Sequence, residues 1–216
     1  MNAYLISGIG ADYRLFTHIV LPPGYEVRHI HWIAPEKEES LPAYACRLAG
    51  QIDLKTPFIL IGFSLGGIMA TEIANRCHPV RTIIISSVPI SSQLPPYYRH
   101  AHRLRLSKLV TPQVMKFFAS AKFRLTMRRG NRKIMREVIR AGDNRFITWA
   151  MHAVLDWRNE TIPGSLVHIH GAWDEIFPVR WTRPTFTIPK AGHNLVLRRA
   201  AEVNRLLREI LPSGGQ

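Results

Sequence analysis

The sequence predicts an α/β fold with about six mostly parallel strands, helices on both faces of the sheet, and an inserted helical segment. Short, continuously apolar runs such as 57–61 and 80–87 alternate with longer segments of helical spacing. Fully apolar strands of this kind are typical of a parallel sheet that is covered on both faces. The alternation stops between about 89 and 144 and then resumes, which indicates an insertion.

The elements follow one another in the order that this fold requires. We expect strands at 3–7, 26–33, 57–61, 80–87, 165–170 and 184–188. We expect core helices at 12–20, 40–52, 64–77, 144–157 and 195–211, and helical segments at 103–109, 112–125 and 132–141 inside the insertion. Asp12 and Ser40 stand where N-caps belong, and Pro22-Pro23-Gly24 ends the first helix. The core is therefore assigned to 1–90 and 144–216, and the insertion to 91–143.

Composition narrows the class of protein. With 216 residues, 46% of them hydrophobic, the chain is long enough for one core and a small subdomain. No segment approaches the roughly 20 apolar residues of a membrane span, and the first residues lack the basic region of a secretory signal. Cys46 and Cys77 lie in apolar helical contexts and are expected to be buried free thiols in a reducing compartment. We therefore expect a cytoplasmic location.

The positive charge is concentrated in the insertion. Of the net charge of +14, residues 97–145 carry +12, from 14 Lys and Arg and 2 acidic residues. The rest of the chain has 15 Lys and Arg and 13 acidic residues, which leaves only +2. This asymmetry favours a separate structural unit at 97–145.

The stretch around Ser64 carries the strongest functional signal. Apolar residues 59–61 run into Gly62-Phe63-Ser64-Leu65-Gly66, and a helical pattern follows at once. A strand, a tight turn with a central serine and a helix form a nucleophile elbow, in which the neighbouring positions must be small. The alternative is an ordinary glycine-rich turn between a strand and a helix.

An acid and a histidine follow the last two predicted strands. Asp174 comes after the strand at 165–170, and His193 comes after the strand at 184–188. The carboxyl ends of parallel strands share one edge of the sheet, so both should lie near Ser64. A serine hydroxyl needs a base, and the base needs an orienting carboxylate. We predict Ser64 as nucleophile, His193 as base and Asp174 as orienting acid, with Asp156 and Glu175 as rival acids.

Two backbone N–H groups are expected to bind the oxyanion of the tetrahedral intermediate. One belongs to Leu65, which follows the nucleophile. The other belongs to the loop after the first strand, where Ile9 is the first choice and Gly10 the second.

The remaining histidines give a weak signal for metal. His29-x-His31 and His168-x-His170 each place two imidazoles on one face of a strand. No carboxylate or cysteine stands at ligand spacing beside either pair, so we predict no metal site.

These motifs together resemble the α/β-hydrolases over essentially the whole chain apart from the insertion. The matching pieces are Gly62-Phe63-Ser64-Leu65-Gly66, Gly171-Ala172-Trp173-Asp174 with Pro178, and Gly192-His193. More narrowly, Gly8-Ile9-Gly10-Ala11-Asp12 resembles the N-terminal loop of a poorly characterised group of small bacterial serine hydrolases. The chain departs from larger members by starting at the first parallel strand. It also has Ser7 where many members have histidine.

The resemblance implies a Ser-His-Asp hydrolase that uses neither a metal nor an organic cofactor, with the insertion as a lid over the active site. We predict that it cleaves a carboxylic ester or thioester through an acyl-enzyme. One alternative is hydrolysis of a C–C bond, amide or lactone with the same triad, which ester and amide versions of one acyl group would distinguish. The other is a protein with an idle triad that binds a ligand or partner.

The basic insertion suggests which partners to expect. A cationic lid over an apolar pocket favours a small acyl substrate with an anionic end, or peripheral contact with an anionic membrane. Nucleic acid is the least favoured partner because no base-reading motif accompanies the charge. The sequence does not specify the acyl-chain length or the oligomeric state.

Overall fold

The core of the protein is a six-stranded sheet. The computed structural model describes residues 1–98, 111, 113, 116 and 129–212. The strands are β1 (Asn2–Ile6), β2 (Glu26–Ile30), β3 (Phe58–Phe63), β4 (Arg81–Ile85), β5 (Leu166–Gly171) and β6 (Phe186–Ile188). Their order is β2-β1-β3-β4-β5-β6, and every neighbouring pair is parallel. The predicted parallel α/β fold is thus confirmed.

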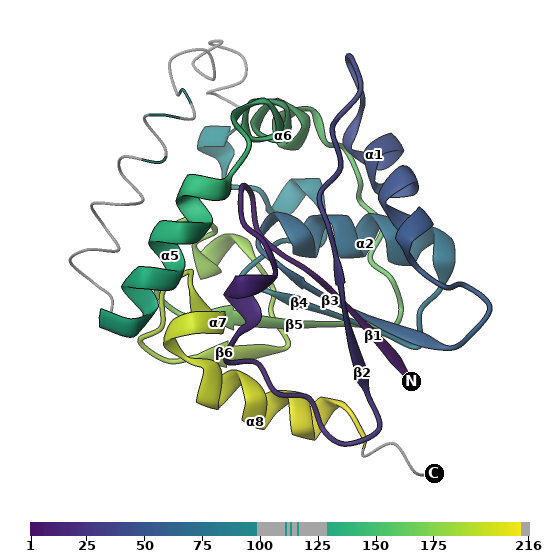
Figure 1. Ribbon diagram of the computed structural model, residues 1–216, viewed down its shortest axis with the longest axis vertical. Coiled ribbons are helices and arrows are strands. Elements are labelled where there is room, and N and C mark those ends of the chain that lie inside the picture. The colour runs from purple at the N-terminus through teal and green to yellow at the C-terminus, as the bar shows by residue number, and fades with distance from the viewer. Residues whose placement is uncertain (99–110, 112, 114–115, 117–128, 213–216) are drawn as a thin grey trace.

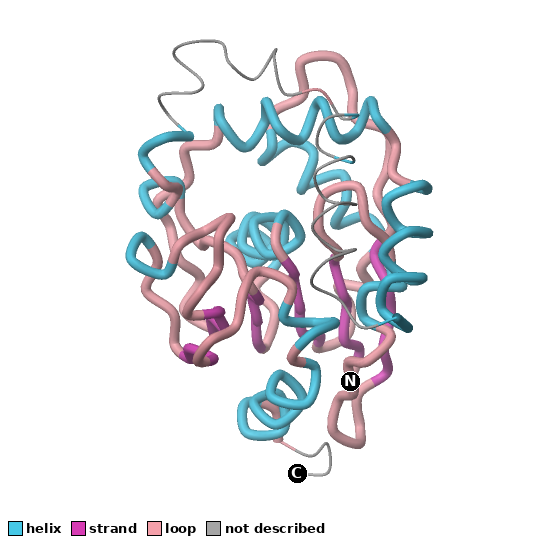
Figure 2. Tube along the Cα trace, turned by 90° about the vertical axis from the view of Figure 1, so that its left-hand side faces the viewer, coloured by secondary structure: helices cyan, strands magenta, loops and turns pink. Residues whose placement is uncertain are grey.

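Helices cover both faces of this sheet (Figure 1). They are α1 (Leu41–Leu48), α2 (Leu65–Cys77), α5 (Arg129–Ala141), α6 (Asn144–Asp156), α7 (Leu195–Arg198) and α8 (Ala200–Ile210). Helices α1, α2 and α6 lie on one side and α8 lies on the other, so the strands (magenta in Figure 2) are enclosed between helices. Short 3-10 helices form at Tyr13–Phe16, Ala49–Gln51, Ser91–Gln93 and Val179–Trp181.

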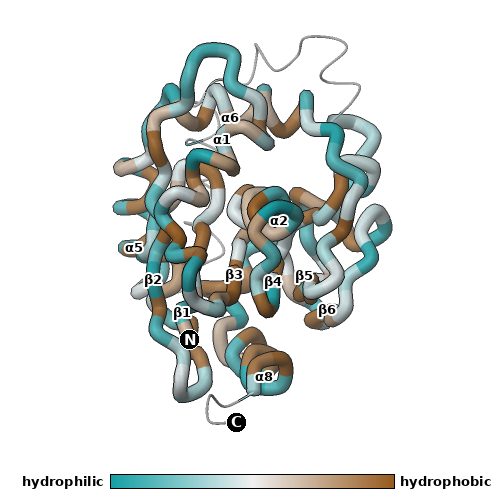
Figure 3. The backbone as a smooth tube through the Cα atoms, turned by 90° about the vertical axis from the view of Figure 1, so that its right-hand side faces the viewer, coloured by the Kyte–Doolittle hydropathy of each residue, from teal (hydrophilic) through white to brown (hydrophobic). Residues whose placement is uncertain are grey.

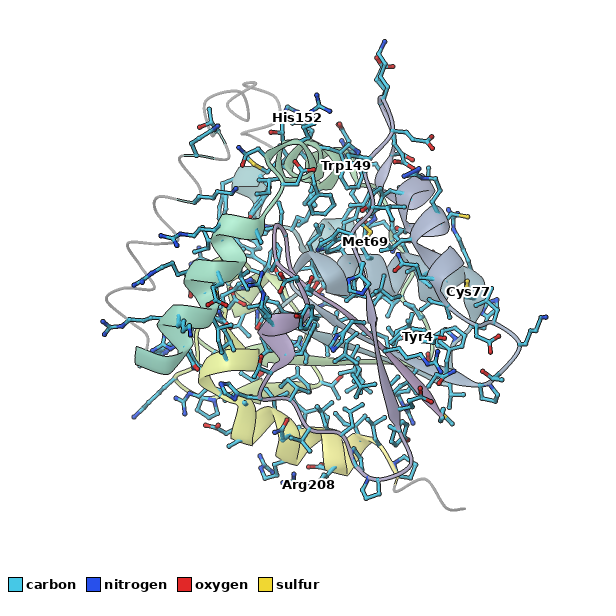
Figure 4. All side chains as sticks on the ribbon, viewed as in Figure 1. Tyr4, Met69, Cys77, Trp149, His152 and Arg208 are labelled. Carbon is cyan, nitrogen blue, oxygen red and sulfur yellow. The ribbon has the colours of Figure 1, made fainter. Side chains whose placement is uncertain are left out.

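The alternation of side chains along the strands divides the core into two layers. In β1, Tyr4 and Ile6 pack with α1, α2 and α6, whereas Ala3 and Leu5 pack with α8 and α5. Successive side chains of a strand point to opposite faces, and both faces of the inner strands are covered, so β3 is buried throughout, whereas the first three residues of the edge strand β2 are exposed. The hydropathy colouring of Figure 3 shows mixed hydrophilic and hydrophobic residues along the edge strand β2 and an amphipathic α8. In Figure 4, Tyr4 and Met69 lie between sheet and helices, whereas Arg208 lies on the outer side of α8.

Two predicted helices differ from the observed structure. The helix expected at 12–20 is only the 3-10 turn Tyr13–Phe16. Although Asp12 caps it by accepting from the Arg14 N–H, the next residues bond to α8: Asn204 Oδ1 accepts from the Val20 N–H and Asn204 Nδ2 donates to the His18 carbonyl. A tertiary contact thus replaces the helical hydrogen bonds.

The expected closing helix at 195–211 is interrupted at Arg199, whose φ of −132° and ψ of 31° are not helical. Leu195, Val196 and Leu197 are all buried. The short α7 is therefore mostly buried, whereas α8, which begins at Ala200, buries only Val203, Leu206 and Leu207.

Some further expectations need correction or fall outside the described residues. The strand expected at 26–33 ends at Ile30, and the helix expected at 40–52 continues as a 3-10 turn after Leu48. Cys46 is exposed, not buried, because the buried side of α1 is formed by Tyr44, Ala45 and their neighbours. The predicted helical segments at 103–109 and 112–125 fall almost entirely outside the described residues.

The close contact of α2 with the end of β1 is possible because Gly66 has no side chain. A Cβ at this position would lie 2.1 Å from the Ile6 carbonyl oxygen and 2.4 Å from that of Ser7. Backbone atoms cannot move aside cheaply, so Gly66→Ala should lower the free energy of unfolding by about 2–3 kcal/mol. Urea unfolding would measure this loss.

Gly50→Ala is the matched control, because a Cβ there has no neighbour within 4 Å. This variant should change stability by less than about 1 kcal/mol. A Gly66→Ala protein as stable as the control would contradict the close contact.

Candidate active site

The backbone at the end of β3 presents Ser64 in a strained turn. Ser64 has φ 55° and ψ −120°, and α2 begins at the next residue. A positive φ of this kind is rare for a residue with a side chain and is characteristic of functional sites. The turn is tight enough that a Cβ on Gly62 would lie 2.2 Å from the Gly66 carbonyl oxygen. The motif therefore has the geometry of a nucleophile elbow, with Ser64 at the N-terminal end of α2.

Asp174 lies in a buried turn directly after β5. Its side chain has no exposed surface, and Oδ1 accepts hydrogen bonds from the N–H groups of Ile176 and Phe177 at 2.9 Å each. Burial raises the pKa of this carboxyl. The hydrogen bond and charge of His193 and the N–H of Phe177 lower the pKa by more than burial raises it, so it lies below its ordinary value. Asp174 is therefore a carboxylate near neutral pH.

His193 connects Asp174 to Ser64. Its Nδ1 lies 2.9 Å from Asp174 Oδ2, and its Nε2 lies 3.0 Å from Ser64 Oγ. The ring stands in an aromatic setting, 5.3 Å from the Phe63 ring and 5.9 Å from that of Phe177 between centroids. Because the Asp174 carboxylate can only accept, the neutral ring of His193 carries its proton on Nδ1 and donates it to Asp174. Its Nε2 is then free to accept from the serine hydroxyl. The structure thus brings together the three side chains predicted from the sequence.

The lack of a side chain at Gly171 allows the loops that carry Asp174 and His193 to meet. A Cβ on Gly171, the last residue of β5, would lie 2.4 Å from the Ala191 carbonyl oxygen and 2.8 Å from that of Gly192. The Trp173 N–H donates to the same Ala191 carbonyl at 2.8 Å. This contact holds the loop that carries His193 against the loop that carries Asp174.

The two rival acids do not face the imidazole nitrogens of His193. Glu175 is exposed and its carboxylate accepts the backbone N–H of His193 at 3.2 Å, so it contacts the loop and not the ring nitrogens. Asp156 is on α6 and lines a different cavity of about 650 Å³ between α1, α2 and α6. The acid that bonds to the histidine ring is Asp174.

The loop after β1 lies beside Ser64. A Cβ on Gly8 would be 3.4 Å from the Ser64 Cβ, and the Ala11 N–H closes the turn by donating to the Gly8 carbonyl at 3.1 Å. Gly10 has a φ of +63°, which favours glycine. Ile9 lies inside this turn, and Leu65 is the first residue of α2. Of the two backbone positions expected to bind an oxyanion, Leu65 directly follows the serine and Ile9 lies in the loop that approaches it through Gly8.

The two histidine pairs differ in their surroundings. His29 stacks on Phe16, with 6.1 Å between ring centroids. His168 and His170 are buried on β5 and bond to each other, with 2.9 Å between His168 Nε2 and His170 Nδ1. Within the described residues, no group of three or more His, Cys, Asp or Glu side chains could hold a metal ion. Their two-residue spacing predicted that His168 and His170 lie on one face of a strand. It did not predict that they bond to each other or that His170 lies beside Asp174.

The comparisons with known proteins agree with this architecture. A model of the alpha/beta hydrolase family matches residues 10–206, and the chain belongs to this family. No curated protein sequence matches it significantly. In the part of the chain that the structure describes, no helix is both long and apolar enough to cross a bilayer.

Several solved structures share the fold at low identity. A thermophilic esterase from Thermogutta terrifontis is 17% identical, with 97% of this chain and 88% of that chain covered and a TM-score of 0.67. MenH from S. aureus is 15% identical, with 98% and 93% covered and a TM-score of 0.72. A carboxylesterase structure from the thaumarchaeon Nitrososphaera gargenis is 17% identical, with 96% and 88% covered and a TM-score of 0.69. At these identities the likeness describes the fold alone.

His168 should make folding stability depend on pH in the weakly acidic range. Burial, followed by the neighbouring His170, lowers the pKa of His168 to about 3. In the unfolded chain a histidine takes up a proton below about pH 6.5. The contribution of His168 to the free energy of unfolding is therefore fully present above about pH 6.5. It is lost by about 1.4 kcal/mol for each pH unit as the pH falls toward 3.

Urea unfolding at pH 7 and pH 5 would test this expectation in the wild type and in His168→Gln. Between these values the wild type should lose about 2 kcal/mol more than the variant. Asp174 does not interfere, because a carboxylate with a lowered pKa loses its contribution only below about pH 4. Equal losses in both proteins would show that His168 is not buried as a neutral ring.

Proposed function

We propose that this hydrolase cleaves a carboxylic ester or thioester of a small acyl substrate through an acyl-enzyme. The supporting observation is the unbroken hydrogen-bonded chain from Ser64 Oγ through His193 to the buried carboxylate of Asp174. Such a chain supplies a nucleophile, a base of suitable orientation and a counter-charge for the imidazolium that forms.

The first half of the reaction forms the acyl-enzyme. His193 Nε2 accepts the Ser64 proton while Oγ attacks the carbonyl carbon of the substrate. The electron pair of the carbonyl moves to its oxygen, where the N–H groups of Ile9 and Leu65 stabilise the charge together with the N-terminus of α2. When the tetrahedral intermediate collapses, the bond to the leaving group breaks, and His193 returns the proton to the departing alkoxide or thiolate.

The second half releases the acid. A water molecule gives a proton to His193 Nε2 and attacks the acyl carbon. The new intermediate then collapses to the carboxylic acid as the bond to Ser64 Oγ breaks and His193 returns the proton to Oγ. Asp174 remains a carboxylate and stabilises the imidazolium at each proton transfer. All of these steps use side chains and backbone groups of this chain, and none requires a cofactor.

We further propose that residues 91–143 form a lid over this site. In the described part of this segment, α5 packs on the core through Met135 and Val138. The Asn194 side-chain nitrogen, next in sequence to His193, lies 3.7 Å from the Met135 sulfur. Lys133, Arg136 and Arg140 of α5 are exposed. This position beside the base supports a cationic lid that favours substrates with an anionic end; the alternative role of the same charge is contact with an anionic membrane.

An active-site serine probe tests the catalytic proposal. A fluorophosphonate should label the wild type but not Ser64→Ala, because the bond forms at Oγ. Asp174→Asn should slow both labelling and ester hydrolysis by about 10⁴-fold, since the amide supports the wrong imidazole tautomer. Circular dichroism and thermal unfolding would show that both variants are folded. A folded wild type without labelling would refute the hydrolase mechanism.

Neutral and anionic esters of the same acyl group test the role of the lid. For the anionic ester, kcat/KM should fall as salt rises from 10 mM to 500 mM, because salt screens the attraction to α5. The triple variant Lys133→Glu, Arg136→Glu, Arg140→Glu should lower kcat/KM for this ester by about tenfold and leave the neutral ester unchanged. Equal rates for both esters at every salt concentration would remove the anionic substrate from the proposal.

A further inference from the structure

Two buried imidazoles that take no part in the proposed proton transfer lie directly behind Asp174. His168 and His170 are 1% and 0% exposed. His170 Nε2 lies 2.7 Å from the Phe177 carbonyl oxygen and 3.5 Å from Asp174 Oδ2. His168 Nε2 lies 2.9 Å from His170 Nδ1. Buried polar groups of this kind need partners; His170 finds one in the loop that carries the acid, and His168 finds one in His170.

A single carbonyl group dictates the tautomers of both rings. The Phe177 carbonyl can only accept, so His170 carries its proton on Nε2. In the neutral ring His170 Nδ1 is then an acceptor, so His168 must carry its proton on Nε2 and donate. The two N–H groups therefore donate in the same direction: His168 donates to His170, and His170 donates to the acid loop.

Both rings are neutral near pH 7. Burial, followed by the neighbouring imidazole, lowers the pKa of His168, and burial lowers that of His170 although Asp174 and the Phe177 carbonyl act in the opposite direction. A cationic His170 would compete with His193 for the charge of Asp174. A neutral His170 offers the carboxylate only an N–H dipole, which leaves the negative charge available to His193.

The bond to Phe177 connects this pair to the orientation of the acid. The Phe177 carbonyl accepts from His170, while the Phe177 N–H donates to Asp174 Oδ1 at 2.9 Å. One residue thus transmits the position of His170 to the carboxylate. At the other end of the pair the Ser87 backbone lies beside His168, and Ser87 Oγ donates to the Ser64 carbonyl at 2.7 Å. The pair therefore occupies the space between the acid turn and the serine turn.

We propose that His170, oriented by His168, is a positioning residue that sets the direction of the Asp174 carboxylate toward His193. This inference rests on the proposed function, because the direction of the carboxylate matters only if His193 acts as base. Displacement of a reacting group by about 1 Å is enough to lower a rate by about a hundredfold. His170 touches neither the substrate nor Ser64 in this role and acts through Asp174 alone.

Two substitutions at position 170 separate positioning from packing. His170→Met fills a similar volume without a donor, whereas His170→Gln retains an N–H at a similar reach and an acceptor for His168. With a p-nitrophenyl ester, His170→Met should lower kcat and the rate of fluorophosphonate labelling by about 10- to 100-fold with KM unchanged. His170→Gln should recover most of this loss. Equal losses in two folded variants, or a native rate in His170→Met, would overturn the proposal.

The ring tautomers of the wild type provide a test that requires neither activity nor a variant. Nitrogen-15 NMR of the histidine side chains should show protons on Nε2 of both His168 and His170, and on Nδ1 of His193. A proton on Nδ1 of His170 would overturn the proposal even if His170→Met does not fold. Wild-type protein that has the expected tautomers but is not labelled at Ser64 would refute the proposed function, which keeps the two failures distinguishable.

Discussion

Close backbone contacts at the carboxyl edge of the sheet are the constraint on which the rest of the site depends. Gly66 lets the first turn of α2 contact the carbonyl groups at the end of β1, and Gly171 lets the end of β5 contact the loop before His193. Any side chain at these positions would separate the elements by more than a hydrogen bond tolerates. The 3.0 Å contact between His193 Nε2 and Ser64 Oγ bridges 129 positions of sequence, so small displacements of either loop would break it.

The active site also depends on a buried carboxylate whose oxygens are all hydrogen-bonded or in contact with donor groups. Asp174 has no exposed side-chain surface, and a carboxylate in such a place is costly unless it is hydrogen-bonded. Two backbone N–H groups and the His193 ring meet this need. The His193 ring and the Phe177 N–H lower the pKa of Asp174 despite its burial. The neutral imidazoles of His168 and His170 stand behind the carboxylate without neutralising it. The same electrostatic arrangement that stabilises the turn therefore directs the negative charge toward the base.

Much of the fold and of the candidate site could be predicted because both depend on local rules. A strand was predicted at each of the six observed positions, most directly from the apolar runs at 57–61 and 80–87, and the Gly-x-Ser-x-Gly motif predicted the turn at Ser64. The errors occurred where tertiary contacts compete with local preference. Asn204 on α8 takes the backbone groups of His18 and Val20, so the helix expected there stops after one turn. The last helix is interrupted at Arg199 between the buried α7 and the amphipathic α8, and Cys46 faces outward although its neighbours are apolar.

The sequence by itself determined the class of fold, the order of the strands along the chain, and the strand ends at which a serine, an acid and a histidine meet. Periodicity and motif spacing encode these features because the buried strands of a parallel sheet are apolar and all of its strands end at the same side. The tertiary structure decided which nitrogen of His193 faces which partner, and that Asp174 rather than Glu175 or Asp156 bonds to the ring. It also joined His168 and His170 to the acid turn. These outcomes depend on distances of a few ångströms between loops, which no pattern along a single strand or helix specifies.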